Sequence, residues 1–236
     1  MRKVISIFTA VLFLVSCGES KNKININIYG ELFKIMHENQ REGTISLPSV
    51  ISQPHTYGLG SMEGLDGEVL ILDSKILVNK VEKGGIPSYQ TEVSNDDLAL
   101  LLVTAQVEKW QTVIIDQAES MSTIDAAVKQ YADKMAINTN KPFPFIIEGE
   151  VEMVNWHIVS NPAPGGGCEE HSAGSWNRTD NQKKVKIFGF YSEHHQAIFT
   201  HHTTFTHMHV LFEDEQLSGH IDDIKLNSNW SLAVPK

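Results

Sequence analysis

The sequence predicts an α/β (α+β) fold of two subdomains, with mixed, largely antiparallel β-sheets and a few helices. Short apolar segments separated by turn residues recur along the chain, a pattern typical of strands joined by hairpins. Only a few segments space their apolar residues like one face of a helix. A loop signal at 138–144 divides the chain near residue 140. We therefore expect an N-terminal α/β subdomain over 27–140 and a C-terminal β-rich subdomain over 141–236.

The N-terminus has the pattern of an export signal. A basic start precedes the apolar run 4–15, which is too short to span a membrane permanently. The following Leu-Val-Ser-Cys at 14–17 resembles the bacterial lipobox, in which the cysteine is lipidated after cleavage. We expect a lipoprotein signal peptide over 1–17, lipid on Cys17, and a polar tether over 18–26. The protein would then be exported and lipid-anchored to the bacterial cell envelope. The alternative is an ordinary secretory signal.

The first part of the N-terminal subdomain is predicted to contain a helix and a strand pair. Residues 27–42 place apolar side chains at helical spacing, and Gly43 ends the pattern. Residues 45–52 fit either a short helix or a strand. Residues 67–73 form a predicted buried strand that turns directly into a second strand over 76–81.

The second part of this subdomain is predicted to contain two strands and a helix. Residues 99–107 and 111–115 fit strands with an intervening turn, although 98–107 also fits a buried helix and periodicity does not decide between them. Residues 122–134 fit a helix because a capping hydroxyl precedes apolar residues on one face.

The C-terminal subdomain is predicted to consist of strands and one long loop. Residues 145–147 and 151–159 fit a hairpin joined through Gly149. Residues 160–184 are rich in Gly, Asn, Pro and Ser and are predicted to form a loop. Its only cysteine, Cys168, is expected to be a spare loop thiol. Four short strands complete the chain, at 185–191, 197–202, 205–213 and 218–226.

Composition limits the class of partner. Hydrophobic residues make up 41% of the 236 residues and charged residues 20%, which is ordinary for a globular domain with a real core. The formal net charge is -10 and the lysines are scattered, so the chain offers no basic face to nucleic acid. An acidic metabolite would need a local positive centre, which a bound dication can supply.

Histidines concentrate near the C-terminus in a pattern that predicts a metal site. His207 and His209 stand two apart on a predicted strand, so both rings face the same side. His220 follows at the spacing that a hairpin needs to bring a third ring beside them. Three neutral imidazoles with one open position are the ligand set of a catalytic zinc. The alternative is a polar strand face of solvent-exposed histidines.

Three segments resemble one known family. His-Met-His-Val-Leu-Phe at 207–212 and Gly-His-Ile-Asp-Asp at 219–223 resemble the metal-binding segments of acetolactate decarboxylases. Residues 57–69 look like that family's Gly-Leu-Gly-Thr-Phe-x-x-Leu-Asp-Gly-Glu signature. Residues 143–154 resemble its strand ending Ile-x-Gly-x-Phe-x-x-Val, with valine in place of the phenylalanine. The resemblance runs from about residue 29 to residue 226.

The resemblance implies a two-part fold with mixed sheets, one Zn²⁺ bound by the three histidines, and a glutamate near the metal that matches Glu68. On its own, Glu68 would be interpreted as a charged residue at the mouth of a strand. Counting from Gly149, the position of the family's active-site arginine falls on His157. We also expect the family's C-terminal tail, which brings a second glutamate to the metal, to be absent here.

The activity implied by the resemblance is that of a zinc-dependent carbon–carbon lyase, which converts 2-acetolactate to acetoin and carbon dioxide. The metal would act as a Lewis acid on the chelated hydroxy-ketone. Glu68 would orient the hydroxyl or shuttle a proton, and His157 would stand where the arginine is. The expected partners are a small hydroxy-keto acid and the membrane, reached through the lipid anchor.

Two other functions fit the same ligands. The three histidines and an open position would also suit a zinc-dependent ester hydrolase, or a non-enzymatic surface lipoprotein that binds metal or a hydroxy acid. His201 and His202 are close enough in sequence to reach the same cavity, although most such residues are ordinary strand histidines. The oligomeric state stays open, with a homodimer as one alternative.

Overall fold

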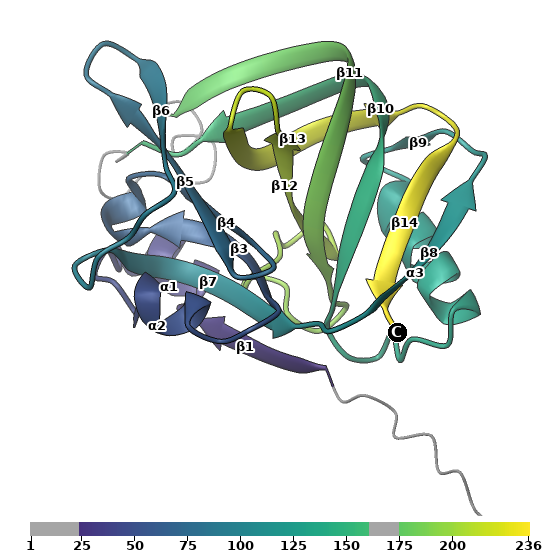
Figure 1. The fold of residues 1–236 in the computed structure, drawn as a ribbon, viewed down its shortest axis with the longest axis horizontal. Helices are drawn as coiled ribbons and strands as arrows, with labels where there is room; N and C mark the ends of the chain where they lie inside the picture. Colours follow the sequence, from purple (N-terminus) through teal and green to yellow (C-terminus); the bar gives the residue numbers. More distant parts are fainter. Residues whose placement is uncertain (1–23, 161–174) are drawn as a thin grey trace, which may run out of the picture.

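The computed structural model describes residues 24–160 and 175–236 (Figure 1). The expected signal peptide, Cys17, most of the tether and Cys168 lie outside the described residues. Within the described ranges the strands form two seven-stranded sheets, which confirms the predicted class of a largely antiparallel, β-rich fold with few helices. Across these same ranges, every helix is too short or too polar to cross a membrane.

The first sheet has the strand order β1-β7-β3-β4-β5-β6, and the short strand β2 also pairs with β7. The pairings in this sheet are antiparallel. Its strands are β1 (Asn25–Tyr29), β2 (Ile45–Ser46), β3 (Thr56–Met62), β4 (Glu68–Leu72), β5 (Lys75–Glu82), β6 (Ile86–Gln90) and β7 (Leu98–Gln106). Three short helical segments accompany it, namely α1 (Leu32–His37), α2 (Leu47–Ile51) and η1 (Glu63–Leu65).

The second sheet has the order β8-β14-β10-β11-β12-β13-β9. Because β13 pairs with β10 as well as with β12, strands β10 to β13 close into a ring. The elements of this half are β8 (Trp110–Ile115), β9 (Glu119–Ser120), α3 (Ile124–Lys134), β10 (Phe143–Ile158), β11 (Trp176–Tyr191), β12 (Thr206–Phe212), β13 (Leu217–Leu226) and β14 (Trp230–Pro235).

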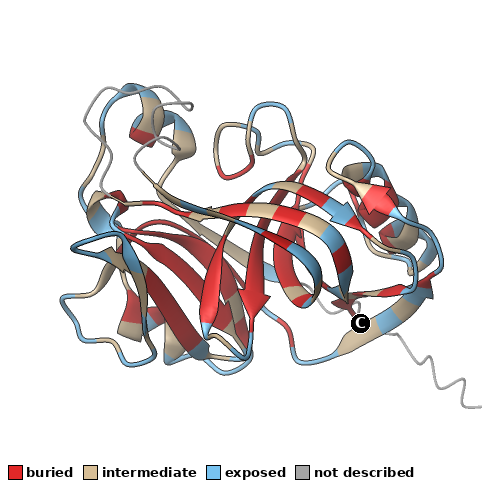
Figure 2. Cartoon of the chain, turned by 90° about the horizontal axis from the view of Figure 1, so that it is seen from above, coloured by how far each residue is buried: buried red, intermediate tan, exposed pale blue. Residues whose placement is uncertain are grey.

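The described residues form three large apolar layers and one smaller cluster, which includes Ile35 of α1 and Leu100 of β7. One layer lies between the first sheet and α2, and it includes Leu47 and Val78. A second lies between the sheets, where Leu59 of β3 packs with Phe188 and Phe190 of β11. The third fills the ring of strands, and Figure 2 shows how strongly burial concentrates on the strands rather than on the loops. Side chains alternate in direction along a strand. The strands that form the ring therefore point some side chains into the ring and others toward the first sheet.

Several predicted elements are confirmed. The 67–73 and 76–81 strand pair is the β4–β5 hairpin, and the 122–134 helix is α3. Residues 98–107 form a strand rather than a helix. The 45–52 segment combines its two alternatives, because a two-residue strand runs into helix α2.

The predicted helix over 27–42 is wrong in its first part. Asn25–Tyr29 is a strand that pairs with β7, and only Leu32–His37 is helical. Gly30 separates the two, with a φ of +79°. A Cβ atom there would lie 2.1 Å from the carbonyl oxygen of Leu100, so the chain needs glycine at this close crossing. Ile and Asn alternate in β1, and this period of two indicates a strand, in competition with the helical spacing of the apolar residues.

The predicted hairpin through Gly149 is also wrong, because β10 runs unbroken through this residue. A Cβ atom on Gly149 would lie 2.7 Å from the Cβ of Trp230. The glycine therefore provides room for a neighbouring strand rather than a turn. That neighbour, β14, was not predicted, and neither was β6.

Two predictions in the last third of the chain need correction. Part of the predicted 160–184 loop is strand, because β11 begins at Trp176 and pairs with β10 along its length. The predicted strand at 197–202 is a series of turns that docks on α1, where the N–H of Leu32 donates to the carbonyl of Ile198 at 2.8 Å. The chain changes sheets between β7 and β8, and the division into subdomains near residue 140 stays a prediction.

Candidate metal centre

Three histidines meet on the side of the ring that faces the first sheet. His207 and His209 point to the same face of β12, and His209 lies directly opposite His220 in the β12–β13 pairing. One nitrogen from each ring lies within 4.8 Å of the other two. The sequence-based prediction that these three rings converge is thereby confirmed, and we call them the histidine cluster.

Three ring nitrogens of the cluster, from His207 and His209, lack hydrogen-bond partners within the described ranges. His209 is fully buried and His207 is 8% exposed. Among the described residues, the Nδ1 of His207 and both ring nitrogens of His209 have no hydrogen-bond partner. Leaving buried polar nitrogens unpaired is unfavourable unless something else binds them. Three convergent imidazole nitrogens are a ligand set for zinc, so the residues present fit such an ion.

Burial keeps the cluster in the form that binds metal. It lowers the pKa of His207 to about 4, with a further lowering by His157 that the carbonyl of Phe199 partly opposes. Burial also lowers the pKa of His209 and of His220 well below the usual histidine value. The three rings are therefore neutral near pH 7, as a metal ligand must be.

Glu68 reaches the cluster from the first sheet. It is the first residue of β4, it is 5% exposed, and its Oε2 lies 3.4 Å from the Nε2 of His209. The backbone N–H of Val159 donates to its other oxygen at 3.2 Å. Burial raises the pKa of Glu68 to about 7, although His157 and the Val159 N–H act in the opposite direction. Glu68 therefore lies beside the cluster, as the family resemblance implied.

His157 lies on the other side of His220. The two residues face each other in the β10–β13 pairing, and their ring centroids are 5.2 Å apart. The Nδ1 of His157 is 2.9 Å from both carboxylate oxygens of Asp222. Burial lowers the pKa of His157, but the hydrogen bond with Asp222 and the charge of Glu68 outweigh it, and the net shift is upward. Asp222 was not singled out from the sequence, although it stands two residues after His220 on the same strand face.

His201 and His202, the other histidines considered from the sequence, are not members of the cluster. The rings of His201 and His202 lie in the segment between β11 and β12, with centroids 4.0 Å apart and planes tilted by 39°, and His201 contacts Thr203 through Nδ1. Burial is the largest cause of the lowered pKa of His220, and the charge of His201 makes a small further contribution. Arg178 of β11, an arginine on the strand next to β12, is paired with Asp180 and Glu215.

Fold and site together define a class: a β-rich α+β protein with a largely buried group of three histidines that could hold a metal ion. The chain belongs to the alpha-acetolactate decarboxylase family, whose model matches residues 31–235. This agrees with the resemblance read from the sequence motifs.

Solved structures support the same fold. The acetolactate decarboxylase of Bacillus subtilis subspecies spizizenii is 17% identical, with a TM-score of 0.70 over 89% of this chain and 86% of that chain. The alpha-acetolactate decarboxylase of Bacillus subtilis strain 168 is 16% identical, with a TM-score of 0.68 over 89% and 85%. A Staphylococcus aureus protein of unknown function similar to the same enzyme is 17% identical, with a TM-score of 0.68 over 89% and 84%. A search of curated proteins found no match.

Proposed function

We propose that the protein is a zinc-dependent decarboxylase that converts 2-acetolactate to acetoin and carbon dioxide. The observation that carries this proposal is the histidine cluster, in which buried ring nitrogens of His207 and His209 lack hydrogen-bond partners in the described part of the chain, with the carboxyl group of Glu68 beside it. Membership of the family supports a lyase of this kind.

His207, His209 and His220 would hold the zinc ion. When bound, the ion supplies Lewis-acid polarisation of a ketone oxygen, the chemistry that decarboxylation of a β-keto acid requires. The ligands come from two adjacent antiparallel strands, which fix their relative positions through backbone hydrogen bonds. The chain thus offers a rigid site rather than one assembled from loops.

Glu68 is the residue we assign to proton transfer. Decarboxylation breaks the bond between the carboxyl carbon and its neighbour, and the electron pair stays behind on the substrate, so one proton must be added there. The Oε2 of Glu68 lies 3.4 Å from the Nε2 of His209 and would orient the substrate hydroxyl or deliver that proton. Its burial excludes bulk water from competing for this role.

His157 is the residue we assign to the carboxylate side of the substrate. Asp222 holds its Nδ1, which fixes the orientation of the ring beside His220. The raised pKa of His157 favours the cationic form of its ring. This cation can pair with the substrate carboxylate before the carboxylate leaves as carbon dioxide. An arginine would do this in a bidentate manner, so we expect weaker substrate binding here.

We further propose that the protein is exported and anchored through lipid on Cys17, as the N-terminal pattern indicates. The test is to express the full chain and its Cys17→Ser variant in a bacterium and separate membranes from soluble fractions. Wild-type protein is expected in the membrane fraction, and the variant is expected to lose its lipid. Equal membrane association of the two would contradict the anchor.

The enzymatic proposal is tested by measuring acetoin formed from racemic 2-acetolactate, with and without a zinc chelator. Acetoin formation that the chelator abolishes and added zinc restores is the expected result. A zinc-loaded sample that forms no acetoin would reject the decarboxylase. Turnover of simple esters by that same sample would point instead to a hydrolase that uses the same ligands.

A further inference from the structure

Asn79 forms a buried link between the two sheets close to the histidine cluster. It lies on β5 and is fully buried. Its Nδ2 donates to the carbonyl of Gln216 at 3.1 Å and to the carbonyl of Ser88 at 3.2 Å. The backbone N–H of Ser218 donates to its Oδ1 at 3.0 Å. The amide group thus uses both of its N–H donors and its oxygen on main-chain atoms of other segments.

These partners connect Asn79 to the metal hairpin. Gln216 is in the turn between β12 and β13, and Ser218 stands two residues before His220, on the same face of β13. Strand β13 lies against β4 and β5 of the first sheet (Figure 1). Asn79 therefore fixes the end of the hairpin that carries the three metal ligands.

Asn79 also stands directly beside the strand that carries the catalytic carboxylate. In the β4–β5 pairing, Asn79 faces Glu68, and opposite residues in an antiparallel pair point to the same side. One side chain of this pair reaches His209, while the other holds the β12–β13 turn. Together, Asn79 and Glu68 fix the distance between the histidine cluster and the carboxylate of Glu68.

We infer that Asn79 is a positioning residue for the metal centre, acting through the backbone of the β12–β13 hairpin. The inference rests on the metal site of the proposed function. Only a carboxamide of this size can donate twice and accept once, because aspartate lacks the donors and leucine lacks all three groups. A substitution would free the turn and leave buried backbone groups without partners. The hairpin could then shift against β4, and the ligand geometry would loosen.

The test compares Asn79→Ala with Val78→Ala in the purified protein. Val78 is the adjacent residue on β5, but its side chain packs on the opposite face with Leu47 and Val69, away from the hairpin. Its truncation destabilises the same strand by leaving a cavity. Zinc affinity is measured by chelator competition, and the visible spectrum of the Co²⁺-substituted protein reports ligand geometry. Neither reading requires substrate.

Asn79→Ala is expected to weaken zinc binding by about 10-fold or more and to change the Co²⁺ spectrum. Val78→Ala is expected to lower the melting temperature but to bind zinc within about twofold of the wild type. Wild-type affinity and an unchanged spectrum in Asn79→Ala would overturn the inference. So would equal losses of affinity in both variants, because a general loss of stability would then explain them.

Asn79→Asp serves if the alanine variant does not fold. It keeps the acceptor for Ser218 and removes both donors, so weaker zinc binding is again expected, and wild-type binding would overturn the inference. Failure of the proposed function has a different signature. A wild-type protein that binds no zinc rejects the metal centre itself, whereas a zinc-binding protein that forms no acetoin rejects only the decarboxylase.

Discussion

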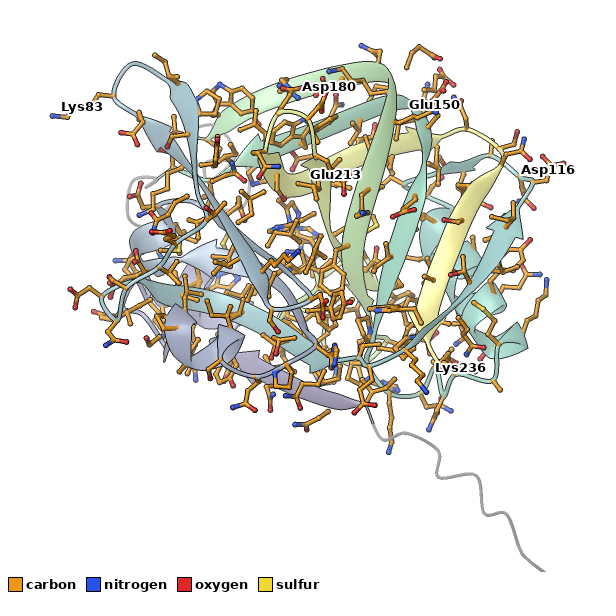
Figure 3. The ribbon with its side chains drawn as sticks, viewed as in Figure 1. Lys83, Asp116, Glu150, Asp180, Glu213 and Lys236 are labelled. Atoms are coloured by element: carbon orange, nitrogen blue, oxygen red, sulfur yellow. The ribbon has the colours of Figure 1, made fainter. Side chains whose placement is uncertain are left out.

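Two clusters of polar side chains on the ring of strands differ in how many of their atoms lack hydrogen-bond or ion-pair partners. The histidine cluster faces the first sheet. The second group, which we call the outer network, consists of Arg178, Asp180, Lys183 and Glu215. Figure 3 labels Asp180 on β11. In the outer network each charge meets a counter-charge, with Arg178 2.7 Å from Asp180 and Lys183 2.9 Å from Glu215.

The cluster has no such internal balance. Its rings approach one another, yet buried nitrogens of His207 and His209 have no hydrogen-bond partner among the described residues. Polar groups that satisfy one another require nothing further, whereas convergent and unsatisfied groups are completed by an external ligand. Within the described ranges, the outer network leaves only the Nη2 of Arg178 unpaired, so the convergence of several unpaired nitrogens, rather than the presence of polar residues, marks the functional side of the ring.

The largest expected effect comes from removing ligands of the cluster. In the His207→Ala, His209→Ala double variant, acetoin formation is expected to fall by at least about 1,000-fold, since a Lewis-acid metal contributes several kcal/mol to the barrier. The check is kcat/KM in zinc-supplemented buffer, with circular dichroism to show that the fold is retained. Activity within tenfold of the wild type would place catalysis elsewhere in the chain.

A smaller effect is expected from Glu68→Gln. This variant keeps the shape of the side chain and removes its proton-transfer capacity, so kcat should fall by about 100-fold while zinc remains bound. Steady-state kinetics and metal content together provide the check. Loss of zinc in this variant would mean that Glu68 is mainly a ligand rather than a proton carrier.

The same variant is expected to change how stability depends on pH in the metal-free protein. The folded pKa of Glu68 is about 7 against an ordinary 4.5, so the folded carboxyl keeps a proton that the unfolded chain releases. The stabilisation that this carboxyl group gives the folded protein is therefore fully present below pH 4.5 and is lost as pH rises through 7. Glu68→Gln should gain stability over the wild type across that window, by at most about 3 kcal/mol. Urea melts at pH 5 and pH 8 give the comparison.

The smallest effect on activity is expected from the outer network. Arg178→Ala removes hydrogen bonds to Asp180 and Glu215 and should cost about 1–3 kcal/mol of folding stability. Because Lys183 still pairs with Glu215, and Asn79 still binds Gln216 and Ser218, the β12–β13 turn stays anchored in this variant, so kcat and zinc affinity should stay unchanged. A tenfold loss of zinc affinity here would erase the distinction between the two groups.

Local patterns made the cluster predictable from the sequence. The spacing of His207 and His209 fixes a shared strand face, and a short turn brings His220 opposite His209. The β4–β5 hairpin and α3 were equally accessible, because their signals span neighbouring residues.

The remaining parts of the site depend on contacts between distant segments. Asp222 meets His157 across 65 residues of sequence, and Asn79 meets Ser218 across 139. No periodicity encodes such pairs. Gly149 was misread for the same reason, because the residue that requires its small size, Trp230, lies on a strand far along the chain.

The metal content of the purified protein is the most direct test of the central claim, that His207, His209 and His220 together bind one metal ion. Elemental analysis after dialysis against zinc should find about one equivalent per chain in the wild type and in Arg178→Ala, and almost none in the His207→Ala, His209→Ala variant. Equal metal content in all three proteins, or none in the wild type, would contradict the claim.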